Sequence, residues 1–274
     1  MLPFAVSIAI LGLVQAALVA LPVWRRLPWI ARLRSRWWAL VPALSIVVVV
    51  AIIELDSSSA KALAWLALVA VPPLAAVALA WLVHGSRAAW ALAVLPLFAL
   101  AWASRGSLAG EAAATALSGL GCISLGWMLV SVVPALWLRL GVYAMAAVDT
   151  YFVASDLLQG PNALLSVAAP VAGLPRLQAV HFGSAQMGFG DLFVAALVGC
   201  LLAKQPADGP KCRDIRDISA RRQWTGAVLV AVLALVFDLL FFAVDELPAT
   251  VPVAVALAAV TALGRRQWRP LAQL

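Results

Sequence analysis

Four of the twelve acidic residues lie inside apolar stretches of the sequence, where an ionisable side chain is energetically costly. They are Asp149, Asp156, Asp191 and Asp238. Two carboxyl groups that lie close together can share one proton, so that one acts as a base and the other as an acid. Such a pair can activate water to hydrolyse a peptide bond, or it can relay protons.

The number of residues between each aspartate and the basic residue at the end of its apolar stretch gives the depth of that aspartate in the membrane. A helix rises about 1.5 Å per residue, so Asp149, ten residues after Arg139, lies roughly 15 Å into its apolar stretch. Asp191, thirteen residues before Lys204 on the next stretch, lies roughly 20 Å in. The other two lie roughly 24 to 26 Å in, close to the opposite surface, and are expected to be structural or interfacial. We expect Asp149 and Asp191 to face each other near the midplane.

The elements that carry these residues are predicted to be transmembrane helices. The chain of 274 residues is 65% hydrophobic and 11% charged, with a mean hydropathy of +1.03, far from the composition of a soluble domain. A helix needs roughly 20 apolar residues to cross a bilayer. We predict an all-α polytopic membrane protein with nine transmembrane helices, near residues 2–23, 38–54, 62–83, 88–103, 112–133, 137–158, 180–203, 224–244 and 247–264.

The distribution of Lys and Arg predicts the orientation. If the first connection is cytoplasmic, all but three of the nineteen basic residues lie on the cytoplasmic side, the exceptions being Lys61, Arg105 and Arg176. The N-terminus is then outside, the C-terminus is cytoplasmic, and residues 204–223 form a cytoplasmic loop. This clustering explains the net charge of +7 without a nucleic acid partner. The short loops indicate a prokaryotic plasma (inner) membrane, with membrane lipids as partners.

The chain is predicted to have two parts, a scaffold of five helices in residues 1–133 and a catalytic part of four helices in residues 134–274. Three prolines interrupt the connection 158–180 between helices six and seven, so a regular spanning helix is not expected there. The three cysteines have no metal-ligand spacing. No metal and no cofactor are predicted, and the oligomeric state is left open.

Two glycines precede the second aspartate in the stretch QMGFGDLFV, residues 186–194. Gly188 and Gly190 place no side chain on the approach to Asp191, so a second backbone can come close to it. A peptide substrate needs such access. Small residues also allow membrane helices to pack tightly, which is the structural alternative.

These motifs together resemble the intramembrane aspartyl proteases of the presenilin and signal peptide peptidase type. That family has an aspartate followed by aromatic residues in its sixth span, Gly-x-Gly-Asp in its seventh, and Pro-Ala-Leu at the start of its ninth. Here VDTYFV surrounds Asp149, GFGD ends at Asp191, and LPATVPVA opens the ninth stretch. The resemblance covers the C-terminal half. It departs from the family at Val148, where tyrosine is usual, and at Thr250, which replaces leucine.

The resemblance implies an aspartic endopeptidase that cleaves peptide bonds within transmembrane segments, with Asp149 and Asp191 as its catalytic residues. The predicted orientation is similar to that of signal peptide peptidases, so transmembrane peptides from type II membrane proteins or signal-peptide remnants are the expected substrates. The implied substrate-binding residues flank the second aspartate and open the ninth helix: Gly188, Phe189, Gly190, Pro248, Ala249 and Thr250.

Two other functions remain open. Prepilin peptidases are also membrane aspartyl enzymes with Gly-x-Gly-Asp, but they usually carry a lysine two residues after that aspartate, where this chain has Phe193. They also often have a cytoplasmic Cys-x-x-Cys pair, which this sequence lacks. A proton-coupled transporter would use Asp149, Asp191 and Asp238 as a relay.

Overall fold

The computed structural model describes residues 2–26, 30–33, 35–41, 44, 47–48, 51–52, 59–155, 173–204, 213–242 and 247–268. Eight of the seventeen residues of the predicted span 38–54 and residues 158–172 of the prolyl connection lie outside the described residues, as do Asp156 and Cys212.

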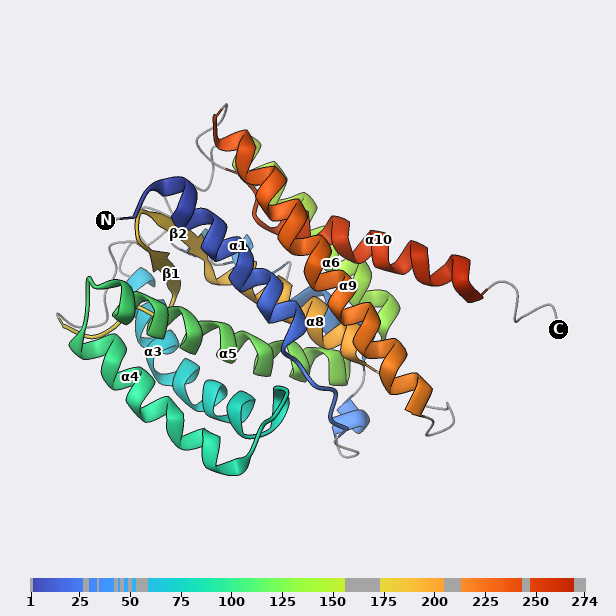
Figure 1. Cartoon of the computed structure of the whole chain (residues 1–274), viewed down its shortest axis with the longest axis horizontal. Helices are drawn as coiled ribbons and strands as arrows, with labels where there is room; N and C mark the ends of the chain where they lie inside the picture. The colour runs from blue at the N-terminus through green and yellow to red at the C-terminus, as the bar shows by residue number, and fades with distance from the viewer. Residues whose placement is uncertain are drawn as a thin grey trace.

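The described chain is mostly helical, as predicted (Figure 1). Its first half contains α1 (Phe4–Ala20), η1 (Ile30–Leu33), η2 (Arg36–Leu40), α3 (Ser59–Val77), the π-helical turn η3 (Ala78–Leu82), η4 (Ala88–Ala93), α4 (Val94–Ala103) and α5 (Leu108–Val132). Its second half contains α6 (Ala135–Ala154), the strands β1 (Ala179–Phe182) and β2 (Ala185–Gly188), α8 (Phe189–Ala203), α9 (Arg213–Asp238), η5 (Leu239–Phe242) and α10 (Thr250–Trp268).

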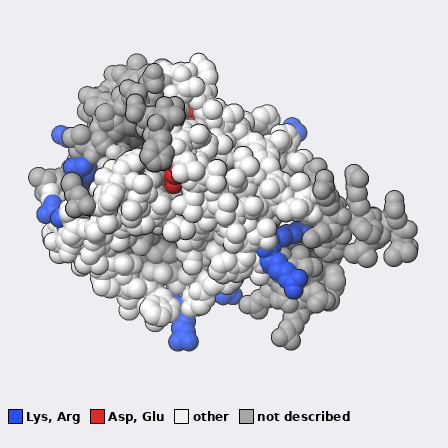
Figure 2. Space-filling model, turned by 45° about the horizontal axis from the view of Figure 1, so that its top comes forward, with Lys and Arg blue, Asp and Glu red and all other residues white. Residues whose placement is uncertain are grey.

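Three of the described helical stretches are long and apolar enough to cross a membrane: Ser59–Leu82, Leu108–Val132 and Ser219–Asp238. Four shorter apolar helices accompany them, Phe4–Ala20, Ala88–Ala103, Phe189–Ala203 and Thr250–Leu263. Helix α6, which carries Arg139 and Asp149, belongs to neither group. The face in Figure 2 is mostly uncharged, and the Lys and Arg side chains lie toward its margins.

Helix α8 occupies the centre of the bundle and contacts α1, α5, α6, α9 and α10. Helices α3 and α4 lie on the opposite side of α5 from α9 and α10 (Figure 1). Two glycines permit the closest of these approaches. A Cβ on Gly199 would lie 2.6 Å from the carbonyl oxygen of Leu18 in α1, and a Cβ on Gly126 would lie 3.0 Å from the Cα of Leu197. Small residues therefore hold the helix that carries Asp191 tightly between α1 and α5.

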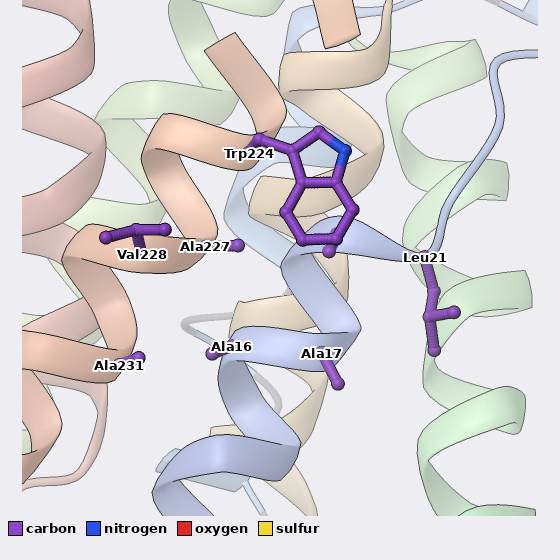
Figure 3. A pocket seen from close by; sticks show the side chains of 8 residues that line it. Ala16, Ala17, Leu21, Trp224, Ala227, Val228 and Ala231 are labelled. Atoms are coloured by element: carbon purple, nitrogen blue, oxygen red, sulfur yellow. The ribbon is translucent and has the colours of Figure 1, made fainter. Parts of the chain in front are cut away.

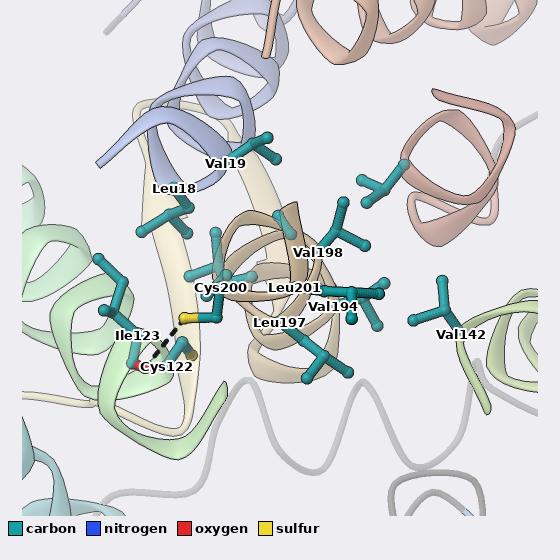
Figure 4. Close-up of a cluster of buried hydrophobic side chains, with 14 of the residues drawn as sticks. Leu18, Val19, Cys122, Ile123, Val142, Val194, Leu197, Val198, Cys200 and Leu201 are labelled. Atoms are coloured by element: carbon teal, nitrogen blue, oxygen red, sulfur yellow. Dashed lines mark hydrogen bonds between the residues drawn. The ribbon is translucent and has the colours of Figure 1, made fainter. Parts of the chain in front are cut away.

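The main hydrophobic core surrounds α8 (Figure 4). Leu197 of α8 packs in this core with Leu18 of α1, Ile123 of α5 and Val142 of α6, all of them buried. The buried thiol of Cys200 donates a hydrogen bond to the carbonyl oxygen of Ile123, at 3.6 Å. The elements of both predicted parts of the chain thus contribute to the same core.

The structure corrects two predicted boundaries. The stretch 180–203 is not one continuous helix, because β1 and β2 form an antiparallel hairpin and α8 begins only at Phe189. The expected loop 204–223 ends early, since α9 begins at Arg213. Residues 211–223 contain neither proline nor glycine, so nothing in the backbone opposes a helix there.

Candidate active site

Helices α6, α8 and α10 each contact the other two, and this packing brings the predicted site residues together. Asp149 lies in the second half of α6, and Asp191 lies in the first turn of α8. Both side chains are partly buried, and their carboxyl groups interact electrostatically. The two predicted catalytic aspartates therefore lie near each other, on the two helices expected to carry them.

Thr250, the first residue of α10, contacts Asp149 directly. Its buried hydroxyl donates a hydrogen bond to Asp149 Oδ2 at 2.6 Å. Leucine, which the family motif has at this position, cannot make this bond. The departure from the motif at Thr250 thus gives one aspartate a fixed partner from the third helix of the site.

Asp191 is oriented by the backbone that precedes it. Its Oδ2 atom accepts a hydrogen bond from the N–H of Gly188 at 3.1 Å, as an acidic residue does when it reaches back to cap a helix. The bond fixes the carboxyl group at the N-terminus of α8, where the peptide dipoles favour negative charge. An asparagine at this position could accept the same bond through its side-chain oxygen but could not exchange a proton. Asp191→Asn would therefore keep the structural role of the side chain and remove its acid–base chemistry.

The two glycines of the GFGD motif differ in their surroundings. A Cβ on Gly188 would lie 3.2 Å from Asp191 Oδ2, so this position must be small for the carboxyl group to sit where it does. A Cβ on Gly190 would have no atom within 4 Å beyond its chain neighbours. The backbone at Gly190 is therefore open in the direction in which a Cβ would point.

We predict that Gly190→Ala lowers peptide cleavage while leaving the protein as stable as the wild type or slightly more so. The structure has room for the methyl group, and alanine in a helix is favoured over glycine by about 0.5–1 kcal/mol. Gly188→Ala should lower both cleavage and stability because it displaces the Asp191 carboxyl group. Thermal unfolding and initial cleavage rates of the two variants check this. Wild-type cleavage by Gly190→Ala would show that no substrate passes there.

Gln15 of α1 is a site-supporting residue that sequence reasoning missed. Its side chain is 1% exposed, and its Nε2 atom donates a hydrogen bond to the carbonyl oxygen of Ala249 at 3.2 Å. Ala249 immediately precedes Thr250, so Gln15 holds the turn that presents the threonine hydroxyl to Asp149. The signal in the sequence was a lone polar side chain within the apolar stretch LGLVQAALV.

Gln15→Leu is expected to lower stability by about 1–3 kcal/mol, because the Ala249 carbonyl loses its buried donor. It should also lower the cleavage rate per folded molecule. Gln223→Leu is the matched control, since Gln223 is 3% exposed and donates an equivalent bond to Pro22 at 2.8 Å, away from the aspartates. Equal cleavage by the two variants would limit Gln15 to a purely structural role.

The β1–β2 hairpin leads directly into α8 and is fixed at its turn. The N–H of Gly183 donates to Glu111 Oε2 of α5 at 2.7 Å, and the N–H of Ser184 donates to Ser7 Oγ of α1 at 3.3 Å. Gly183 has a φ of +63°, and a Cβ there would clash with Ser7.

The remaining predicted substrate-binding residues lie around the same helices. Phe189 packs its side chain against both hydrophobic clusters. Pro248 is buried and lies just before α10 rather than in its first turn, and its carbonyl oxygen accepts a bond from Val251 N at 3.1 Å. The roles of these residues in binding a substrate stay predictions.

Asp238 lies on α9 and faces α1. A Cβ on Gly12 would lie 3.9 Å from Asp238 Oδ2, a buried oxygen that has no hydrogen-bond partner within the described part of the chain. Among the described residues, no three side chains from His, Cys, Asp or Glu gather as metal ligands do.

A groove between α1 and α9 is lined by none of the predicted site residues (Figure 3). Its lining is wholly apolar and consists of Ala16, Ala17, Ala20, Leu21, Trp224, Ala227, Val228 and Ala231. Neither α6, α8 nor α10 contributes to it.

Comparison of the chain with models of known protein families, with curated proteins and with solved structures gave no match. The likeness to intramembrane aspartyl proteases therefore rests on the three sequence motifs alone.

Proposed function

We propose that the protein is an intramembrane aspartyl endopeptidase with Asp149 and Asp191 as its catalytic pair. The observation that carries this proposal is the meeting of the three motifs. The aspartates of α6 and α8 interact electrostatically, and Thr250 of α10 donates a hydrogen bond to one of them. A structural role for each aspartate alone would not require the other to be near.

In the proposed reaction the two carboxyl groups share one proton, since two interacting like charges disfavour double ionisation. The ionised carboxylate takes a proton from a water molecule as the water oxygen attacks the scissile carbonyl carbon. The protonated partner donates a hydrogen bond to the carbonyl oxygen. The tetrahedral species then breaks its C–N bond, and a proton passes to the departing amine, which yields a carboxylic acid and an amine.

The hairpin gives the substrate a route to this pair. A transmembrane helix must unwind before its carbonyl groups can be attacked, and lipid cannot satisfy the freed backbone groups. In a two-stranded sheet each strand has one edge outside the ladder, and an extended peptide can add to such an edge. The strand β2 ends at Gly188, three residues before Asp191, so a peptide along β2 would be led toward the carboxyl groups.

The nine-helix topology, with the N-terminus outside and the C-terminus cytoplasmic, belongs to this proposal. With that orientation, the expected substrates are type II transmembrane segments or signal-peptide remnants in a prokaryotic plasma membrane. Several helices are shorter than a full span; α8, for example, has 15 residues. In this topology Asp191, in the first turn of α8, and the hairpin before it lie below the membrane surface. Non-helical backbone at that depth is tolerated where protein buries it, as α1 and α5 do here.

The proposal is tested by incubating the purified protein in liposomes with a synthetic type II transmembrane peptide. Mass spectrometry should detect two complementary fragments produced by cleavage within the apolar segment. A proton-coupled transporter is the competing function, and the buried carboxyl oxygen of Asp238, which has no hydrogen-bond partner among the residues that the structure describes, favours it as the second candidate. Proton flux without any peptide fragments, lost on Asp238→Asn, would establish the transporter instead.

A further inference from the structure

The apolar groove between α1 and α9 exists because small side chains face each other there. Alanine supplies most of its lining, and Trp224 stands at one end with 62% of its surface exposed (Figure 3). From Trp224 to Ala231 the groove follows about 10 Å of helix, seven residues of α9. A channel of this length and chemistry matches part of an extended hydrocarbon chain.

The end of the groove at Trp224 is positively charged. Arg221 precedes Trp224 by three residues, and Val228 follows it by four, so all three lie on one face of α9. Arg222 lies beside Arg221, and Arg25 follows the end of α1 by five residues; all three arginines are exposed. Residues 2–26 and 219–231, which form and flank the groove, contain no acidic residue.

We propose that this groove is a binding site for an anionic phospholipid. One acyl chain lies along the alanines of α1 and α9, and the phosphate group contacts Arg221, with Arg222 and Arg25 adding to the positive field. Apolar walls that end at a cluster of cations complement an amphiphile that has a hydrocarbon chain and a negative head. The bound lipid would fill the groove and join α1 to α9. The proposal does not depend on the protein being a protease.

Binding is measured by native mass spectrometry and thermal unfolding of the detergent-solubilised protein, titrated with phosphatidylglycerol or with phosphatidylcholine of the same chains. We expect phosphatidylglycerol to bind more tightly and to raise the unfolding midpoint further. Arg221→Gln and Arg222→Gln should each lower its affinity about fivefold, the effect of one basic residue at an anionic lipid surface. Lys61→Gln, a basic residue outside the groove, should change nothing.

The groove itself is tested by filling it. Ala17→Leu and Ala231→Leu place larger side chains in the lining, from α1 and α9 respectively, and both should abolish the preferred binding of phosphatidylglycerol. Val232→Leu, at an exposed position of α9 outside the groove, is the size control and should bind as the wild type does. Equal affinity for the two lipids, or undiminished binding in both filled variants, would overturn the proposal. A change of oligomeric state in the filled variants with lipid binding intact would also overturn it and assign the groove to a second protein chain.

Discussion

Asp149→Asn and Asp191→Asn are each expected to abolish peptide cleavage, with a loss of about 10⁴-fold or more. Residues that act as one catalytic unit lose most of their effect when either is removed, so the double variant should be no worse than each single one. Initial rates with a type II transmembrane peptide measure this. Folding should be retained, because asparagine can still accept the bonds from Thr250 and from the N–H of Gly188.

Asp238→Asn is the matched control for this experiment. It removes a third partly buried carboxyl group, on a helix that the proposed reaction does not use, and it should cleave at a rate close to that of the wild type. Cleavage that survives in either Asp149→Asn or Asp191→Asn would remove that residue from the catalytic pair. Loss of cleavage only in Asp238→Asn would point to a different site.

The second large effect is expected at Thr250. Thr250→Val keeps the shape of the side chain but removes the hydroxyl that donates to Asp149 at 2.6 Å. A hydrogen bond to a charged group contributes about 1.5–3 kcal/mol, so we expect cleavage to fall by about ten- to a hundredfold. Thr250→Ser restores a hydroxyl and should recover most of the activity.

The pair of Thr250 variants separates positioning from packing. If the hydroxyl acts by orienting Asp149 and not by contacting the peptide, kcat should fall in Thr250→Val while KM changes little. Equal kcat in the valine and serine variants would show that the hydrogen bond contributes nothing to the reaction. A loss in both variants, with lowered unfolding temperatures, would assign Thr250 to packing alone.

The sequence predicted the mostly helical fold and the nearness of the two aspartates because both follow from local signals. Apolar stretches predict helices, and similar depths on consecutive stretches predict that Asp149 lies near Asp191. The hairpin had a local signal as well, since Gly183 and Ser184 separate two short strands as a two-residue turn does. That signal was masked by the apolar composition of residues 180–203, which also fits a transmembrane helix.

The contacts that complete the site could not be predicted in the same way. Gln15 and Ala249 are 234 residues apart, and Thr250 and Asp149 are 101 apart, so their hydrogen bonds depend on how α1, α6 and α10 pack. A polar residue in an apolar stretch indicates that its side chain needs a hydrogen-bond partner, but the sequence does not identify that partner. The role of Thr250 therefore emerged only from the packed structure.

Binding of a transition-state mimic tests most directly whether Asp149 and Asp191 act together on a peptide. The probe is a transmembrane peptide whose scissile amide is replaced by a hydroxyethylene group, compared with the same peptide carrying a plain ethylene group instead. We predict that the hydroxyl strengthens binding to the wild-type protein and that this gain disappears in both Asp149→Asn and Asp191→Asn, while the affinity for the ethylene peptide stays unchanged. The same gain from the hydroxyl in all three proteins would contradict the existence of a catalytic aspartate pair.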